Sequence, residues 1–272
     1  MTQPSSFEIK LRTTVTEDYE SFYSGPSPWR DLGAKYKAKN LVEVCNRAGF
    51  RPARILEVGA GEGSILMHLS RKEFGNEYAA LEIANSGVRA IKERAIPGLK
   101  EAQQFNGYEL PYADDSFDAV ILFHVLEHVE YERALLREVR RVAPLHLIEV
   151  PLDYHFAVDE KMEHYLGYGH INVYTPSMIR FLLKSEGFRI EQELLTQTAE
   201  EVWEYIEFVT NKKERTPAAV AALHKRLSDK ALAFYTSPKE RAEQLANAVT
   251  VLTSRAATGL SIFASCLLYT SP

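Results

Sequence analysis

A glycine-rich turn follows an acidic residue in the segment Glu57-Val-Gly59-Ala-Gly61-Glu-Gly63. Glycine lets the backbone bend sharply and lets a ligand approach closely, because no Cβ stands in the way. The segment lies between an apolar run at residues 53–58 and a helical pattern that begins at residue 64. A glycine turn in this place predicts a binding site for a nucleotide-like ligand.

Two features of the turn separate a dinucleotide from S-adenosylmethionine. The dinucleotide fingerprint places glycine at position 64, where this chain has Ser64. The carboxylate of Glu57 would repel a pyrophosphate, whereas it would attract the ammonium group of a methionine moiety in a partly desolvated cleft. The turn therefore favours the methyl donor, and a dehydrogenase is the least favoured class.

A second acid stands at the end of the next predicted strand. Glu82 follows Gly63 at about the 20-residue spacing expected for a carboxylate that binds a ribose. Its oxygens can accept hydrogen bonds from both ribose hydroxyls. The alternative is a solvated glutamate at a strand end, which the combination with the glycine turn makes the weaker interpretation.

Histidines gather in one part of the chain, since six of the eight lie between His124 and His170. His124 follows the fourth predicted strand, and Glu127 and His128 come three and four residues later, so one helical turn would place the three side chains on one side. His170 lies in the loop after the neighbouring strand. Because imidazole titrates near neutral pH, His124 or His170 is the candidate general base.

Strand patterns alternate with helical patterns along the chain, which predicts a parallel sheet covered on both faces. The predicted strands are 53–58, 77–83, 102–105, 117–123, 145–150, 188–195 and 259–265, and the predicted helices are 35–48, 64–71, 86–94, 126–142 and 175–187. Capping patterns at Thr198, Thr216 and Ser237 predict further helices. We therefore predict an α/β fold, a Rossmann-like doubly wound sheet of seven mostly parallel strands with a helical insertion between strands six and seven.

These elements suggest five segments. Residues 1–40 form an N-terminal lid or arm, residues 41–197 the ligand-binding core, residues 198–255 the helical insertion, and residues 256–265 the last strand of the core. The insertion would shape the acceptor site or a homodimer interface. Residues 266–272 resemble the translation of a sequencing-library adapter, with an ordinary apolar tail as the equally weighted alternative.

Three groups of motifs carry a resemblance to a known family. Residues 55–64 resemble motif I of class I S-adenosylmethionine-dependent methyltransferases. Two further groups of residues resemble the broad group that includes the ubiquinone-pathway methyltransferases. The first is residues 106–120 with His124-Val-Leu-Glu-His-Val129, and the second is His170-Ile-Asn-Val-Tyr-Thr-Pro176 with residues 181–183 and 186–188. The family's adenine-contacting residue is usually aspartate, and here Asn106 stands in its place, whose amide oxygen can still accept a hydrogen bond.

The resemblance implies roles for particular residues. The implied cofactor-binding residues are Glu57, Gly59, Ala60, Gly61, Gly63, Glu82, Ile83, Asn106, Gly107 and His124. In the small-RNA 2′-O-methyltransferases and the ubiquinone-pathway O-methyltransferases, two glutamates and a histidine at a similar spacing join a later histidine to hold a metal. The implied set here is His124, Glu127, His128 and His170, which would favour zinc or iron over magnesium. The alternative is that this segment only packs and hydrogen-bonds.

Composition excludes few classes. The 272 residues carry a formal net charge of −5, which gives no support for a polyanionic partner such as nucleic acid. No apolar run approaches the ~18 residues of a membrane span, residues 1–6 lack a secretion-signal pattern, and Cys45 and Cys266 build no disulfide framework. We therefore expect a cytoplasmic protein without a membrane partner.

Taken together, the residues predict a methyltransferase with a small-molecule acceptor, oxygen being preferred over nitrogen or carbon. Positioning alone can supply ~7–11 kcal/mol to such an in-line displacement, so the reaction does not depend on an obvious base. An RNA or protein methyltransferase is the first alternative. A non-catalytic scaffold that binds S-adenosylmethionine is the second, although a scaffold has no need for the intact set of Glu57, the three glycines and Glu82.

Overall fold

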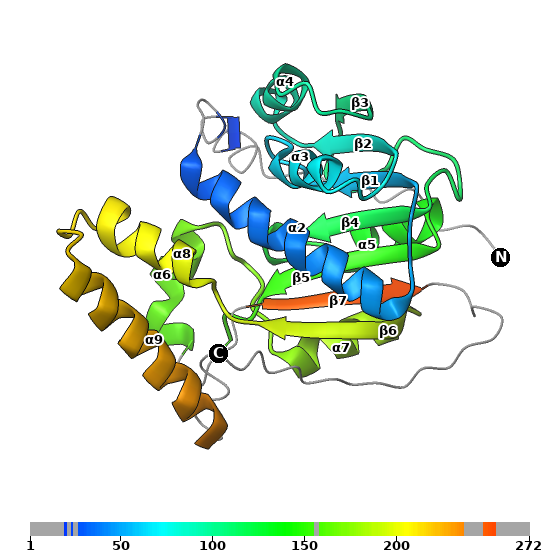
Figure 1. The fold of residues 1–272 in the computed structure, drawn as a ribbon. Helices are drawn as coiled ribbons and strands as arrows, with labels where there is room; N and C mark the ends of the chain where they lie inside the picture. The colour runs from blue at the N-terminus through cyan, green and yellow to red at the C-terminus, as the bar shows by residue number, and fades with distance from the viewer. Residues whose placement is uncertain (1–18, 21–22, 24–26, 155–157, 237–246, 254–272) are drawn as a thin grey trace.

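The computed structural model describes residues 19–20, 23, 27–154, 158–236 and 247–253. Its centre is a seven-stranded sheet with the order β3-β2-β1-β4-β5-β7-β6 (Figure 1). The strands are β1 Arg54–Val58, β2 Glu77–Glu82, β3 Leu99–Gln104, β4 Ala119–Phe123, β5 Leu145–Pro151, β6 Arg189–Thr196 and β7 Asn247–Thr253. Neighbours among β1 to β5 pair in parallel, and β7 pairs antiparallel with both β5 and β6. The predicted α/β Rossmann-like class is confirmed.

The seventh strand lies elsewhere in the chain than the sequence predicted. Residues 259–265 fall outside the described residues, as does the helix start predicted at Ser237, whereas Asn247–Thr253, inside the predicted insertion, form β7. Val249 pairs with Glu149 of β5 on one side and with Leu194 of β6 on the other. Hydrogen bonds from two strands far away in the chain decide this placement, and no local pattern shows them.

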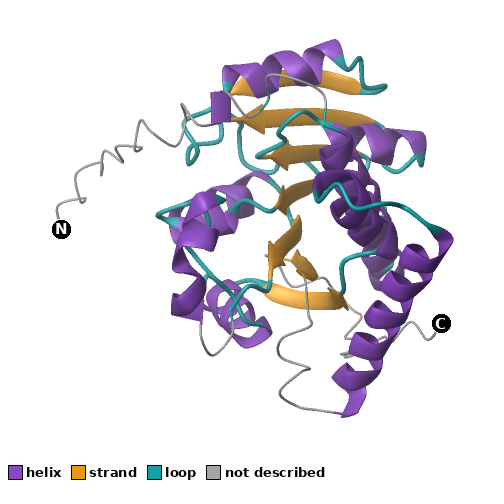
Figure 2. Cartoon of the chain, turned by 90° about the vertical axis from the view of Figure 1, so that its left-hand side faces the viewer, coloured by secondary structure: helices purple, strands orange, loops and turns teal. Residues whose placement is uncertain are grey.

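Helices cover both faces of the sheet, as Figure 2 shows. On one face, α2 (Pro28–Ala48), α3 (Ser64–Arg71) and α4 (Asn85–Glu93) share a buried core with alternate strand residues, among them Ile55 and Ile121. On the other face, α5 (Glu132–Val142) and α7 (Pro176–Ser185) pack against the intervening residues, among them Leu56 and Leu122. This alternation is what a parallel sheet covered on two faces requires.

The helix predicted over residues 126–142 is divided in two. A short 3₁₀ turn, η1 (Leu126–His128), is followed by Val129 in an extended conformation before α5 begins. The side chain of Asn172 donates hydrogen bonds to the carbonyl oxygens of Leu126 and Val129, at 2.9 and 2.7 Å. The break is therefore stabilised by a residue more than forty positions later in the chain.

The first described helix crosses the boundary that the sequence placed at residue 40. α2 begins at Pro28, where the Ser27 side chain accepts a hydrogen bond from Arg30 N, and continues to Ala48. A proline at the first helical position and a serine cap are the usual signals of a helix start. The predicted arm and the predicted core thus share one continuous helix.

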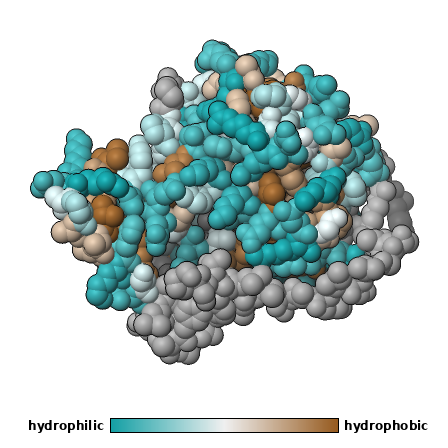
Figure 3. Space-filling view, viewed as in Figure 1, coloured by the Kyte–Doolittle hydropathy of each residue, from teal (hydrophilic) through white to brown (hydrophobic). Residues whose placement is uncertain are grey.

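The remaining helices lie beside the sheet (Figure 1). They are η2 Val158–Lys161, α6 Met162–Gly167, α8 Glu200–Glu204, the π-helical η3 Tyr205–Thr210 and α9 Pro217–Thr236. An ion pair between Lys35 and Glu201 and a ring contact between Trp29 and Tyr205 join α2 to this group. On the face in Figure 3, hydrophobic residues form small separated patches in a mostly hydrophilic surface. Among the described residues, no helix combines the length and apolarity needed to span a membrane.

Candidate functional site

The glycine turn stands where β1 ends, beside the carboxyl ends of β2 and β4. Gly59, Gly61 and Gly63 adopt left-handed backbone angles, with φ of 73°, 58° and 75°. A Cβ on Gly59 would lie only 2.4 Å from Cγ2 of Val125, so a side chain there would also clash. The strand, turn and helix that the motif requires are therefore all present.

Glu82 organises the turn from the end of β2. Its Oε2 accepts a hydrogen bond from Gly61 N at 2.7 Å, and its Oε1 accepts from the N–H groups of Ile83 and Ala84. Burial raises the pKa of Glu82 to about 7. Three of the roughly four acceptor positions of this carboxylate are therefore occupied. To accept hydrogen bonds from both ribose hydroxyls as well, Glu82 would have to share one acceptor position between a hydroxyl and a backbone N–H group.

Glu57 lies buried beneath the turn with an unused oxygen. Its side chain is 2% exposed, and Oε2 has no hydrogen-bond partner among the described residues. Burial raises the pKa of Glu57 to about 8, while Lys37 acts to lower it and Glu82 to raise it further. A buried acceptor without a partner is costly, so this oxygen fits the ammonium group that the sequence predicted for it.

Three described residues of the N-terminal arm lie against the turn. Glu20 accepts hydrogen bonds from the backbone N–H groups of Asn85 and Ser86 at the start of α4. The Tyr23 ring stands over Gly61, since a Cβ there would lie 3.2 Å from the Tyr23 hydroxyl. Tyr19 stacks on Tyr23, with ring centroids 6.2 Å apart. Tyr19, Glu20 and Tyr23 therefore lie beside the glycine turn and the start of α4, and the lid role of residues 1–40 stays a prediction.

Asn106 uses its side chain within its own loop. Its Oδ1 accepts hydrogen bonds from the N–H groups of Tyr108 and Glu109, at 2.9 and 2.8 Å, and its Nδ2 donates to the Glu109 carboxylate. Gly107 provides the left-handed residue of this turn, with φ of 90°. The amide oxygen that was predicted to accept from adenine therefore already holds two backbone donors.

His124 lies between two buried carboxylates. Its Nε2 is 2.9 Å from Oε1 of Glu149, and its Nδ1 is 3.2 Å from Oε1 of Glu127. Burial and the Lys37 ammonium lower the pKa of His124, but these two carboxylates outweigh them and the net pKa is raised. Both ring nitrogens therefore face carboxylates. The group of converging ligand atoms found among the described residues does not include His124, and its roles as a metal ligand and as a base stay predictions.

The other three residues of that set come together. One ligand atom from each of Glu127, His128 and His170 lies within 4.8 Å of the others, and both Glu127 oxygens are buried without a hydrogen-bond partner among the described residues. Nδ1 of His128 is 3.0 Å from the Gly169 carbonyl oxygen, and Nδ1 of His170 is 2.7 Å from Asp153. Because both partners are acceptors, each Nδ1 carries the hydrogen and each Nε2 keeps its lone pair.

Sequence reasoning missed three residues of this site. Glu149 is a lone acid in the apolar strand β5, and Lys37 is a half-buried cation that lies between buried positions of α2. A charged residue in an apolar stripe is the signal that could have identified both. Asp153 carries no such signal, because an aspartate in a loop after a proline-ended strand is common.

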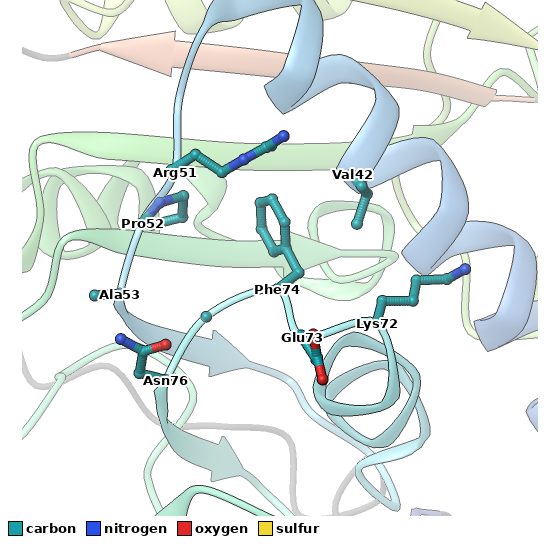
Figure 4. A pocket seen from close by; sticks show the side chains of 9 residues that line it. Val42, Arg51, Pro52, Ala53, Lys72, Glu73, Phe74 and Asn76 are labelled. Atoms are coloured by element: carbon teal, nitrogen blue, oxygen red, sulfur yellow. The ribbon is translucent and has the colours of Figure 1, made fainter.

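The pocket drawn in Figure 4 is not this site. It encloses about 350 Å³ and is lined by Val42, Arg51, Pro52, Ala53, Lys72, Glu73, Phe74, Gly75 and Asn76. Ala53 and Asn76 precede β1 and β2, so the pocket lies at the amino ends of these strands. Open parallel sheets bind their ligands at the carboxyl ends, which is where the glycine turn and the buried acids lie.

A methyltransferase domain family matches residues 30–193, which is more than half of the chain. The chain therefore belongs to this family, which confirms the class I S-adenosylmethionine-dependent resemblance that the motifs carry. The match covers α2, the glycine turn, the buried carboxylates and the histidines of the site.

Individual relatives share parts of the chain. Norajmaline N-methyltransferase of Rauvolfia serpentina is 30% identical over 46% of this chain, and malonyl-[acyl-carrier protein] O-methyltransferase of Halorhodospira halophila is 32% identical over 39%. These alignments cover 46% and 36% of the relatives' own lengths. The structure of a putative sarcosine dimethylglycine methyltransferase from Galdieria sulphuraria superposes with a TM-score of 0.56 at 17% identity, covering 80% of this chain and 85% of that one, and shows the shared fold.

Replacing Gly87 by alanine should weaken the site. A Cβ there would lie 2.7 Å from the carbonyl oxygen of Gly61 and 2.7 Å from Cγ of Glu82. We expect Gly87→Ala to lower the melting temperature and to reduce donor affinity by displacing the turn. The matched control is Gly33→Ala in α2, where a Cβ meets nothing within 4 Å. It should stabilise the protein by about 0.5–1 kcal/mol through helix propensity. Equal effects of the two substitutions in denaturation experiments would contradict the steric argument.

Replacing Glu57 by glutamine should change how stability depends on pH. The folded-state pKa of about 8 lies above the ordinary value, so the contribution of Glu57 is fully present at low pH and is lost as pH rises through about 8. Relative to the parent protein, Glu57→Gln should be little changed at pH 5 and more stable at pH 8.5, by on the order of a few kcal/mol. Thermal unfolding at both pH values measures this. A stability difference independent of pH would refute the assignment.

Proposed function

We propose that this protein transfers the methyl group of S-adenosylmethionine to a small-molecule acceptor, with oxygen preferred over nitrogen or carbon. The glycine turn, Glu57 and Glu82 would hold the donor, whose sulfonium supplies an already activated methyl group. The unpartnered oxygen of Glu57 supports this fit, since an ammonium group would supply the hydrogen bond that this oxygen lacks. The chain's own task is then to align the acceptor with the methyl group and to exclude water.

The proposed preference for an oxygen acceptor rests on the hydrogen bond between His170 and Asp153. Asp153 orients the ring by accepting from Nδ1 at 2.7 Å, so the Nε2 lone pair is available to take a proton. A hydroxyl must lose its proton as its oxygen attacks, whereas a neutral amine can attack through its lone pair first. An oriented imidazole beside the site therefore matches a hydroxyl acceptor better than an amine. The relatives include both N- and O-methyltransferases and do not decide between them.

Buried acids favour a small acceptor over RNA. Glu57, Glu127 and Glu149 are each at most 2% exposed and lie at the same edge of the sheet as the turn. Of these acids, Glu127 keeps a negative charge, because burial acts to raise its pKa but His124 and His128 outweigh burial and lower it, and this charge opposes the approach of a phosphate backbone. An acceptor without phosphates meets no such repulsion, which supports the small-molecule class.

Substitutions at the histidine and its partner test the proposal. His170→Gln and Asp153→Asn should lower the rate with a hydroxyl acceptor by about 10²-fold and 10-fold, the range expected of general-base catalysis and its support. The dissociation constant of S-adenosylhomocysteine should change less than twofold. Asp159→Asn, at an exposed position in η2, is the control. An acceptor screen with matched hydroxyl and amine compounds provides the substrate, and faster turnover of amines with no loss in either variant would contradict the oxygen preference.

A second use of the same nitrogen atoms is metal binding. The proposed ligands are Glu127, His128 and His170, because their ligand atoms converge and each Nδ1 is anchored to an acceptor, as is usual for histidines that hold a metal. A bound zinc or iron ion would act as a Lewis acid toward the acceptor oxygen. In that case His170 would hold the ion instead of a proton.

Cobalt(II) titration distinguishes the two uses. If the metal proposal is correct, Co²⁺ added to the full chain should produce visible absorption bands at one equivalent, and His128→Ala should abolish them. His164→Ala, an exposed histidine of α6, should leave the bands unchanged. The absence of bands from the unsubstituted protein, together with activity that chelators do not reduce, would rule out the metal and leave His170 as the base.

A further inference from the structure

The turn η1, which carries Glu127 and His128, has little structure of its own. It is a three-residue 3₁₀ turn, closed by a hydrogen bond of 2.9 Å from His128 N to the carbonyl oxygen of Val125. A 3₁₀ segment of this length is not stable by itself, because its hydrogen bonds are few and poorly aligned. Leu126 and Glu127 are fully buried, so the carbonyl groups of the turn need donors from other parts of the chain.

The side chain of Asn172 supplies two of these donors. Its amide nitrogen donates to the carbonyl oxygen of Leu126 at 2.9 Å and to that of Val129 at 2.7 Å. In an unbroken helix, backbone N–H groups one turn later would donate to these oxygens. The amide replaces them on both sides of the break between η1 and α5. Asparagine is the shortest side chain with two N–H donors, so neither aspartate nor serine could make both bonds.

The same stretch of chain carries the other histidine of the site. His170 stands two residues before Asn172, and the carbonyl oxygen of Gly169 lies 3.0 Å from Nδ1 of His128. The rings of His128 and His170 meet edge to face, with centroids 4.9 Å apart. Asp153 holds His170 independently, through its contact of 2.7 Å with Nδ1. The position of His128 relative to His170 therefore depends on how η1 is held against this stretch.

Asn172 acts on the backbone and not on the reacting groups. Both hydrogens of its amide are used by the two carbonyl oxygens of the broken helix. On the basis of the proposed function, we infer that Asn172 is a positioning residue, whose amide sets the separation of His128 and His170 by holding η1 against the His170 segment. A misplacement of about 1 Å in such a site can lower a rate by about 10²-fold.

A double-mutant cycle with His170 tests this inference. Asn172→Asp keeps the size of the side chain but replaces both donors by acceptor oxygens. With the hydroxyl substrate from the acceptor screen, we expect kcat to fall by about 10- to 100-fold, while the dissociation constant of S-adenosylhomocysteine changes by less than about threefold. Because the amide acts through the histidines, Asn172→Asp should lower kcat by less than about threefold in the His170→Gln background.

Nuclear magnetic resonance tests the positioning without turnover. Long-range proton–nitrogen correlation spectra show which ring nitrogen of each histidine carries the hydrogen. In the unsubstituted protein, His128 and His170 should both carry it on Nδ1, because each Nδ1 faces an acceptor. In Asn172→Asp, His128 should lose this preference as η1 moves away from Gly169, whereas His170 should keep it through Asp153.

Three variants separate positioning from a general loss of structure. Asn172→Ser keeps one donor and should retain an intermediate kcat, even if Asn172→Asp fails to fold. Tyr174→Phe removes the hydroxyl that also donates to Leu126 O, at 3.2 Å, and should lower kcat by less than about threefold, because the Asn172 amide remains. Asn211→Asp changes an exposed asparagine and should behave like the unsubstituted protein.

The outcomes distinguish this inference from the function on which it rests. Equal losses of kcat in the two backgrounds, or an unchanged His128 tautomer in Asn172→Asp, would overturn the positioning role. An unchanged rate in His170→Gln, or the absence of any hydroxyl substrate, would overturn the proposed function. In either of those cases, loss of the His128 tautomer in Asn172→Asp would still support the positioning of His128 by Asn172.

Discussion

Three carboxylates buried at the ends of neighbouring strands impose the main physical constraint on this protein. Glu57 lies near the end of β1, Glu127 in the turn after β4, and Glu149 near the end of β5. Parallel pairing of these strands brings their carboxyl ends to one edge of the sheet. Like charges in a region of low polarity repel and resist ionisation unless cations or hydrogen-bond donors compensate them. His124, which lies between Glu127 and Glu149, provides part of that compensation, and the Lys37 ammonium opposes the rise that burial causes in the pKa of Glu57.

A buried carboxylate attaches α2 to the glycine turn and to α4. Glu62, in the glycine turn, accepts from Arg30 of α2 at 2.8 Å and from Arg94 at the end of α4 at 2.8 Å. The turn, α2 and α4 are therefore held by one buried carboxylate with two guanidinium partners. Such charge-assisted, two-sided contacts fix orientation as well as distance.

The opposite side of the site is built from loops. The segment after β5 provides Asp153 and His170, and the backbone N–H groups of Ile171 and Asn172 donate to the carbonyl oxygen of Glu127. The 3₁₀ turn that carries Glu127 and His128 is thus supported by the same loop that carries His170. The residues proposed to bind the donor lie at strand ends, whereas those proposed to meet an acceptor lie on loops, where sequences vary without loss of the fold.

Local patterns in the sequence were sufficient for most of the elements and for the glycine turn. Glycines at 59, 61 and 63 meet a backbone requirement that only glycine satisfies easily, and alternating apolar runs identify the buried strands. The edge strand β3 was predicted too short because its exposed polar residues hide the pattern. These features are visible locally because each depends on residues within one or two turns of the chain.

Contacts between distant segments decided the rest. β7 takes its place through pairing with β5 and β6, and Asn172 divides the helix that the apolar spacing predicted after β4. The contact between His124 and Glu149 likewise joins two neighbouring strands, and no local pattern shows it. The type of each side chain, and the face of the helix or strand on which it lies, can be read from the sequence. The charges around that side chain depend on neighbours that only folding brings together.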